Sequence, residues 1–261
     1  MPNLEGFQPG EFCWFELATT DQEAAKKFYM SLFGWTVMDS PMGPTDYYSM
    51  FQIEGRAVAA GYTMRQEERA QGVPPHWMLY VCVASADEIA RRAPELGGKV
   101  FAPAFDVAEF GRMTVVADPT HAIFSVWQPK THRGTQIAGV NGTVCWADLN
   151  TPDPDRAIPF YSALFGWKMA AGEQDPSGYL HIKSGETFIG GIPPAKNLNP
   201  QAPPHWMIYF LVSDCDAAAE RVKELGGTPL MGPLDIPNTG RMAIFKEPQG
   251  AVFAVFAAPA R

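Results

Sequence analysis

Two kinds of hydrophobic spacing alternate along the chain in a fixed order. Residues 12–18 and 76–83 place apolar side chains at every second position, which is typical of strands with one buried face, and the first strand puts Phe12, Trp14 and Glu16 on one side. Residues 21–32 and 85–96 space their apolar side chains by three and four, which predicts amphipathic helices. Short strands follow each helix, near 35–39, 47–53 and 57–62, and then near 99–102, 113–117 and 122–127. The predicted unit is β-α-β-β-β.

The pair of units is itself duplicated. The segment WFELATTDQEAAKKFYMSLFGW, which begins at Trp14, returns as WADLNTPDPDRAIPFYSALFGW from Trp146, with about half of its residues identical. The segments beginning Pro-Pro-His-Trp and Gly-Arg-Met also recur, about 130 residues apart. We therefore predict four β-α-β-β-β modules in two domains, residues 8–129 and 140–258, with a Pro- and Gly-containing linker near 129–141.

These motifs resemble a known superfamily. The pattern Thr-x-Asp-x-x-x-Ala-x-x-Phe-Tyr-x-x-Leu-Phe-Gly-Trp, with the Leu-Gly-Gly and Asp-Pro turns, is similar to the vicinal oxygen chelate superfamily, which includes glyoxalases, bleomycin-resistance proteins and extradiol dioxygenases. The tandem layout with Pro-Pro-His-Trp and Gly-Arg-Met resembles actinobacterial glyoxalase-like proteins that are often labelled hydroxylases. The resemblance implies an α+β fold in which four modules pair into two cup-shaped domains. It leaves open whether modules pair within a copy or across copies.

The resemblance also implies where a divalent metal would be held, by His, Gln or Glu on the first and last strands of each module. Counted from the motifs, these positions carry indole, thioether, small apolar or hydroxyl side chains: Trp14, Met78, Ser125 and residues near 58–60, and in the second copy Trp146, Met207, Ala254 and residues near 189–191. None of them suits a hard or borderline cation. We therefore expect no cofactor and no metal at these positions. Whether the protein binds a divalent metal in another way is left open.

In each copy, a carboxylate on one predicted strand and an imidazole on another could converge on the cup. Glu16 lies near His76, and Asp148 near His205, and such a pair could act as a general base. The alternative is that each histidine closes the end of its strand by a local hydrogen bond. The candidate catalytic residues are therefore Glu16, His76, Asp148 and His205.

Candidate substrate-binding residues complete the two cups. The indole, thioether and phenol side chains suit a flat apolar ligand, and the set is Trp14, Met78, Tyr80, Trp146, Met207 and Tyr209. Arg112 and Arg241 follow glycine in the Gly-Arg-Met motifs and either bind an acidic ligand at the rim or pair with Asp106 and Asp235. The segment from Met64 to Val73 is either a solvated connector or a lid.

Composition narrows the class of partner. The net charge of −8 argues against binding a nucleic-acid backbone, and no run of about 20 apolar residues predicts a membrane span. Four cysteines without a Cys-x-x-Cys pair suit free thiols in a cytoplasmic protein, which we expect to be a monomer or homodimer. The copies differ at Asp118 and His121, which become Glu247 and Gly250, so the two cups are expected to have different duties.

Three functions remain. The first is a bleomycin-resistance-like module that binds a flat or aromatic metabolite or antibiotic without turning it over. The second is a metal-free lyase, isomerase or hydroxylase-like enzyme that uses the carboxylate–histidine pairs on a small carbonyl compound. The third is a metal-dependent lyase or dioxygenase, which only the family fold supports.

Overall fold

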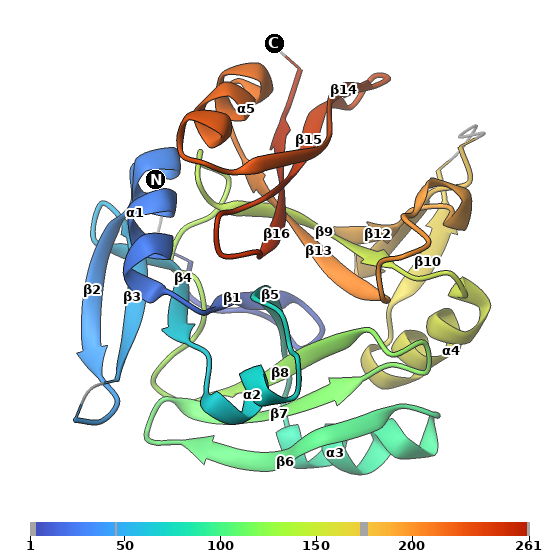
Figure 1. Cartoon of the computed structure of the whole chain (residues 1–261). Helices are drawn as coiled ribbons and strands as arrows, with labels where there is room; N and C mark the ends of the chain where they lie inside the picture. Colours follow the sequence, from blue (N-terminus) through green and yellow to red (C-terminus); the bar gives the residue numbers. More distant parts are fainter. Residues whose placement is uncertain (1–3, 45, 173–176, 260–261) are drawn as a thin grey trace.

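The chain forms two curled β-sheets with helices between and beside them (Figure 1). The computed structural model describes residues 4–44, 46–172 and 177–259. Each sheet has eight strands, and the two strand orders are β2-β3-β4-β1-β5-β8-β7-β6 and β10-β11-β12-β9-β13-β16-β15-β14. This arrangement confirms the predicted α+β class and the two cup-shaped domains.

The elements of the two copies correspond one by one. The first copy contains β1 (Phe12–Thr19), α1 (Gln22–Phe33), β2 (Thr36–Pro41), β3 (Tyr47–Ile53), β4 (Arg56–Thr63), α2 (Gln66–Ala70), β5 (His76–Cys82), α3 (Ala86–Glu95), β6 (Lys99–Val107), β7 (Gly111–Ala117) and β8 (Ile123–Pro129). The second contains β9 (Val144–Asn150), α4 (Pro154–Phe165), β10 (Lys168–Ala171), β11 (Leu180–Ser184), β12 (Thr187–Ile192), the 3-10 turn η1 (Ala195–Asn197), β13 (His205–Leu211), α5 (Cys215–Glu224), β14 (Thr228–Ile236), β15 (Gly240–Lys246) and β16 (Val252–Ala257).

Local sequence fixes the ends of the repeated first helix. The Asp21 side chain accepts a hydrogen bond from the backbone N–H of Ala24 at 3.0 Å, which satisfies one of the free donors at the start of α1. Gly34 ends the helix with φ of 70°, a left-handed conformation that favours glycine. Asp153 and Gly166 do the same for α4.

Two modules of the same copy form each sheet. Strands β1 and β5, the first strands of consecutive modules, run antiparallel at the centre of the first sheet, with Glu16 opposite Met78 and Trp14 opposite Tyr80. Strands β9 and β13 repeat this register in the second sheet. Modules therefore pair within a copy, which the sequence left open.

The two copies share one hydrophobic core on the helix-covered faces of their sheets. Phe33 on α1 packs against Phe210 on β13, with ring centroids 4.8 Å apart, and Trp77 lies 5.2 Å from the same ring. In the converse direction, Tyr161 on α4 packs against Phe124 on β8 at 5.5 Å. Each copy therefore completes its interior with aromatic side chains from the other.

One local expectation was wrong. A β-bulge between Phe12 and Trp14 places these side chains on opposite faces of the sheet, so Phe12 packs against Trp167 and Trp206 in the shared core. The segment 64–73, for which the sequence left a connector and a lid open, joins β4 to β5 and contains the short helix α2. Within the described ranges, no helix has the length and apolar character needed to cross a membrane.

Candidate functional site

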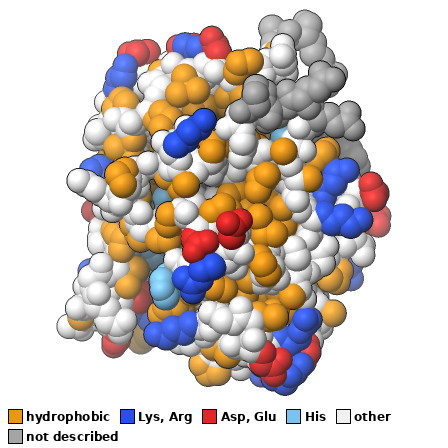
Figure 2. All heavy atoms as spheres, turned by 90° about the vertical axis from the view of Figure 1, so that its right-hand side faces the viewer, with side chains coloured by type: hydrophobic (Ala, Val, Ile, Leu, Met, Phe, Trp, Pro, Cys, Tyr) orange, Lys and Arg blue, Asp and Glu red, His pale blue; other side chains and the backbone are white. Residues whose placement is uncertain are grey.

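The face of each sheet opposite the shared core carries a second layer of apolar side chains. We call these faces cup 1, formed by β1 to β8, and cup 2, formed by β9 to β16. Cup 1 gathers Cys13, Trp14, Ala57, Ala60, Tyr80, Cys82 and Trp127, with Tyr48, Met50, Met78 and Met113 packed against them. Cup 2 gathers Met207, Tyr209, Met242 and Ala254, with Cys145, Trp146, Ile244, Val252 and Phe256. In the view from the side of β10 and β12, a broad area of hydrophobic side chains surrounds a few central charges (Figure 2).

A carboxylate held by two phenols lies on the surface of cup 1. The Tyr48 hydroxyl donates to Oε1 of Glu16 at 2.6 Å, and the Tyr80 hydroxyl donates to Oε2 at 2.8 Å. The indole N–H of Trp14 donates in turn to the Tyr48 oxygen at 3.0 Å. Strands β1, β3 and β5 each supply part of this group, so the sheet register fixes its geometry.

Burial controls the charge of this group. Desolvation raises the pKa of Glu16 above its ordinary value, while the hydrogen bonds from Tyr48 and Tyr80 act in the opposite direction. Burial and the nearby Glu16 carboxylate also raise the pKa of both phenols, which keeps them protonated as donors. Glu16 as a whole residue is nevertheless partly exposed.

Cup 2 contains the same group with a shorter acid. The Tyr179 hydroxyl donates to Oδ1 of Asp148 at 2.5 Å, and the Tyr209 hydroxyl donates to Oδ2 at 2.9 Å. The indole N–H of Trp146 reaches Oδ1 directly at 3.0 Å. Asp148 is 4% exposed, and its burial raises its pKa.

The predicted carboxylate–histidine pairs do not form. The carboxylates bind tyrosines, and Nδ1 of each histidine lies close to a proline carbonyl oxygen, at 2.9 Å for His76 and Pro74 and at 2.8 Å for His205 and Pro203. Both histidines begin their strands, β5 and β13, which places them two residues beyond the carboxylate register. The alternative, a local hydrogen bond at the strand end, is what the structure shows.

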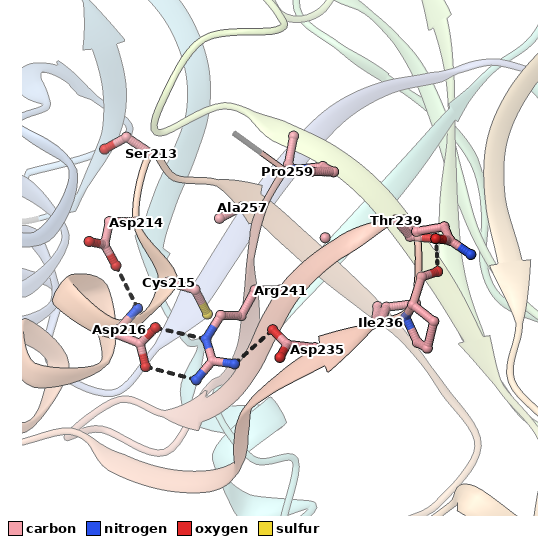
Figure 3. Close-up of a pocket in the computed structure, with 14 residues that line it drawn as sticks. Ser213, Asp214, Cys215, Asp216, Asp235, Ile236, Thr239, Arg241, Ala257 and Pro259 are labelled. Atoms are coloured by element: carbon pink, nitrogen blue, oxygen red, sulfur yellow. Dashed lines mark hydrogen bonds and ion pairs between the residues drawn. The ribbon is translucent and has the colours of Figure 1, made fainter. Parts of the chain in front are cut away.

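The two arginines also lie away from the cups. Arg112 pairs with Asp87 on α3 at 2.7 Å and with Asp106 at 3.5 Å, which places its guanidinium on the helix side of the sheet. Figure 3 shows Arg241 between Asp216 and Asp235, each 2.7 to 2.8 Å away, in a surface groove of about 410 Å³ at the start of α5. Two carboxylates compensate each guanidinium, so neither arginine is available for an acidic ligand in a cup.

Three residues of the cups were missed as site residues. Tyr48 and Tyr179 are not among the predicted site residues, although a tyrosine follows the second strand at equivalent places in both copies. His132, from the linker, packs edge-on against Trp14 with centroids 4.4 Å apart, and burial lowers its pKa to about 4. Its Nε2 is enclosed and has no hydrogen-bond partner among the described residues. A linker histidine gives no periodic signal in the sequence.

The side chains of the cups do not fit a hard divalent cation. The positions implied by the family resemblance carry Trp14, Met78 and Ser125, and Glu16 already accepts two phenol hydrogen bonds. In the part of the chain that the structure describes, no three His, Cys, Asp or Glu residues come together as a metal site.

Comparisons with known proteins agree with this architecture. The family model described as "Glyoxalase/Bleomycin resistance protein/Dioxygenase superfamily" matches residues 12–126 and 143–255. CFP32 of Mycobacterium tuberculosis, named as a candidate glyoxylase, is 40% identical and covers 98% of this chain and 97% of its own. The anthracycline biosynthesis protein DnrV of Streptomyces peucetius is 34% identical over 95% of this chain and 94% of its own.

Solved structures show the same fold at low sequence identity. The Mn(II)-bound glyoxalase from Novosphingobium aromaticivorans superposes with a TM-score of 0.64 at 15% identity, covering 96% of this chain and 82% of that one. The 2,3-dioxygenase LapB from Pseudomonas sp. KL28 gives 0.63 at 12% identity, covering 100% and 94%. At these identities the likeness concerns the fold alone.

Proposed function

Because the chain belongs to the glyoxalase/bleomycin resistance protein/dioxygenase superfamily, we propose that it uses the superfamily's cup to bind a flat, hydroxylated aromatic molecule. One observation carries this proposal, the carboxylate held by two tyrosines within an apolar sheet face, which occurs in both copies. A carboxylate accepts a hydrogen bond from a ligand hydroxyl, and the surrounding indole, phenol and thioether groups contact its rings.

The relatives support an aromatic ligand of several fused rings. DnrV and DauV are both named as anthracycline biosynthesis proteins, and each matches this chain along nearly its whole length. The exposed hydrophobic side chains at the outer strands, among them Met38, Phe105 and Leu234, extend the apolar surface beyond the carboxylate. A large planar ligand would cover more of this surface than a small carbonyl compound.

The test is a titration of the full chain with 2-hydroxyanthraquinone, followed by tryptophan fluorescence and by calorimetry. We expect saturable binding and chemically unchanged ligand on chromatography. Replacement of the carboxylates in Glu16→Gln/Asp148→Asn should weaken binding by about 10- to 100-fold, because a hydrogen bond to a charged group contributes roughly 1.5–3 kcal/mol. The exposed variant Glu54→Gln is the control. Equal affinity in the double variant would refute the role of the carboxylates.

A second function is favoured by the perturbed acid. Burial raises the pKa of Glu16, and a carboxyl with a raised pKa that remains partly exposed can exchange a proton with a bound ligand. Such an enzyme would exchange the hydrogen next to a ligand carbonyl with deuterium from the solvent. Incorporation seen by NMR in the wild type and absent in Glu16→Gln would favour this enzyme over the binding protein.

A further inference from the structure

The carboxylates of the two cups differ in their capacity to accept another hydrogen bond. Asp148 receives three donors, from Trp146, Tyr179 and Tyr209, and is 4% exposed. Glu16 receives two donors and remains partly exposed, since the Trp14 indole bonds Tyr48 alone, whereas the Trp146 indole bonds both Tyr179 and Asp148. Cup 1 therefore keeps an acceptor that a ligand can use, while that of cup 2 is occupied by the protein.

Cup 1 also contains a buried hydroxyl without a partner. Ser125 on β8 is 0% exposed, and its Oγ finds no hydrogen-bond partner among the described residues. It shares the cup face with Tyr80, its register partner on β5. The equivalent pair in cup 2 is Tyr209 with Ala254, which has no polar side chain. Buried hydroxyls are nearly always paired, so this unpaired one points to a ligand atom.

The differences noticed in the sequence lie elsewhere. Asp118 accepts hydrogen bonds from the backbone of Thr120 and Ala122 in a turn, and His121 has a left-handed φ of 79° in that turn. Neither residue belongs to the side-chain cluster of cup 1. Within the cups, the copies differ at Glu16 and Ser125, where cup 2 has Asp148 and Ala254.

Glu16 and Ser125 lie on different strands of the same sheet face. Glu16 and Ser125 are separated by two strand spacings and two residues, because Trp14, Tyr80 and Ser125 lie in one row across the sheet. In a flat sheet their Cα atoms would be roughly 12 Å apart, and curling shortens this distance. The two side chains can therefore bind two separate polar atoms of one ligand, and a fused-ring system carries such atoms on different rings.

Resting on the proposed function, we infer that cup 1 is the ligand-binding cup and that cup 2 is a structural copy. The ligand is a fused-ring aromatic molecule with a hydroxyl that donates to Glu16 and a carbonyl oxygen, farther along the rings, that accepts from Ser125. Met78 and Met113 belong to the cup 1 cluster and lie on β5 and β7, the strands on either side of β8, and their flexible thioethers can adjust to the ligand.

The experiment compares three probes on the full chain by calorimetry: 2-hydroxyanthraquinone, anthraquinone without the hydroxyl, and 2-hydroxyanthracene without the carbonyls. We expect one site per chain for the first probe. Ser125→Ala should weaken 2-hydroxyanthraquinone by up to about tenfold and leave 2-hydroxyanthracene unchanged, since only the carbonyl meets the serine. Glu16→Gln should weaken both hydroxylated probes and leave anthraquinone unchanged. Asp148→Asn and Ala254→Ser, the matched changes in cup 2, should keep the wild-type affinity.

The outcomes separate this inference from the proposed function. If none of the three probes binds saturably, the proposed function fails and the inference fails with it. If 2-hydroxyanthraquinone binds but Ser125→Ala has no effect, or Asp148→Asn weakens it as much as Glu16→Gln, the binding function stands and the assignment to cup 1 is overturned. Circular dichroism of each variant confirms that the fold is retained.

Discussion

The hydroxyl of Tyr80 donates a 2.8 Å hydrogen bond to Oε2 of Glu16, from the neighbouring central strand of the same sheet. The bond joins the two modules of the first copy at the bottom of the cup. It also explains why an acidic side chain is tolerated among apolar neighbours, since a buried charge needs donors to replace water.

Removal of this donor should destabilise the protein in a pH-dependent manner. Tyr80→Phe leaves one carboxylate oxygen without its phenol, and we expect a loss of about 1–3 kcal/mol in the free energy of unfolding at pH 7. The loss should shrink as the pH falls through the raised folded pKa of Glu16 and be smallest by pH 4.5, the ordinary pKa of Glu, where the buried carboxyl already holds a proton. Urea unfolding at both pH values measures this. Tyr62→Phe, whose hydroxyl bonds Glu68, is the control.

Ionisation of Glu16 should itself cost stability. Burial raises its pKa in the folded chain, so the folded state holds the proton more tightly than the unfolded state. Its contribution is complete below pH 4.5 and is lost as the pH rises through the folded pKa. Unfolding free energies of the wild type and Glu16→Gln, measured from pH 4 to pH 8, should therefore diverge in favour of the variant. Parallel curves would contradict this account.

His132 should act in the opposite direction. Burial lowers its pKa from 6.5 to about 4, so its contribution to stability is present above pH 6.5 and is lost as the pH falls toward 4. NMR titration should find one imidazole with a pKa near 4, and its signal should be missing in His132→Phe. That variant should also lose less stability than the wild type between pH 6.5 and pH 4, whereas exposed His121→Gln should behave as the wild type.

The arginines should be dispensable for ligand binding. Arg112 and Arg241 pair with aspartates on the helix side of the sheets, so Arg112→Ala and Arg241→Ala should leave the dissociation constant of 2-hydroxyanthraquinone within about twofold of the wild type. Thermal unfolding should show a small, salt-sensitive decrease in both variants. A tenfold loss of affinity with unchanged stability would restore the arginines to the site.

The shared core should make the two copies unfold together. Phe210 is fully buried and contacts Phe33, Trp35 and Trp77 of the other copy. Phe210→Ala should lower the free energy of unfolding by about 3–5 kcal/mol. Near- and far-ultraviolet circular dichroism should still report one transition. Two separate transitions would show that the copies are independent, and exposed Met38→Ala serves as the neutral control.

Sequence periodicity was enough for the modules and their order, because spacings of two and of three to four residues are local signals. The pairing of modules within a copy was not accessible, since it depends on contacts between distant strands. The β-bulge between Phe12 and Trp14 also gives no signal in the sequence, and it turns the Phe12 side chain to the opposite face of the sheet.

At the candidate site, the sequence predicted Glu16 and Asp148 as candidates but not the tyrosines that bond them. Glu16 and His76 lie on adjacent strands and share one face of the sheet, yet the pleat alone does not say which neighbouring side chain reaches the carboxylate. Tyr48 reaches it from β3, beyond the adjacent strand β4, and the curl of the sheet closes that distance. Curvature is a property of the whole sheet, so no single segment of sequence encodes it.

The exchange of aromatic side chains across the two copies bears on how the duplicated halves can diverge. Because Phe33 packs on the other half and Tyr161 returns the contact, neither half can be lost or swapped without exposing the interior of its twin. Selection for binding in one cup therefore also preserves the fold of the other half, because that half completes the shared core. In such a protein, a cup that binds no ligand is retained because its sheet and helices stabilise the cup that does.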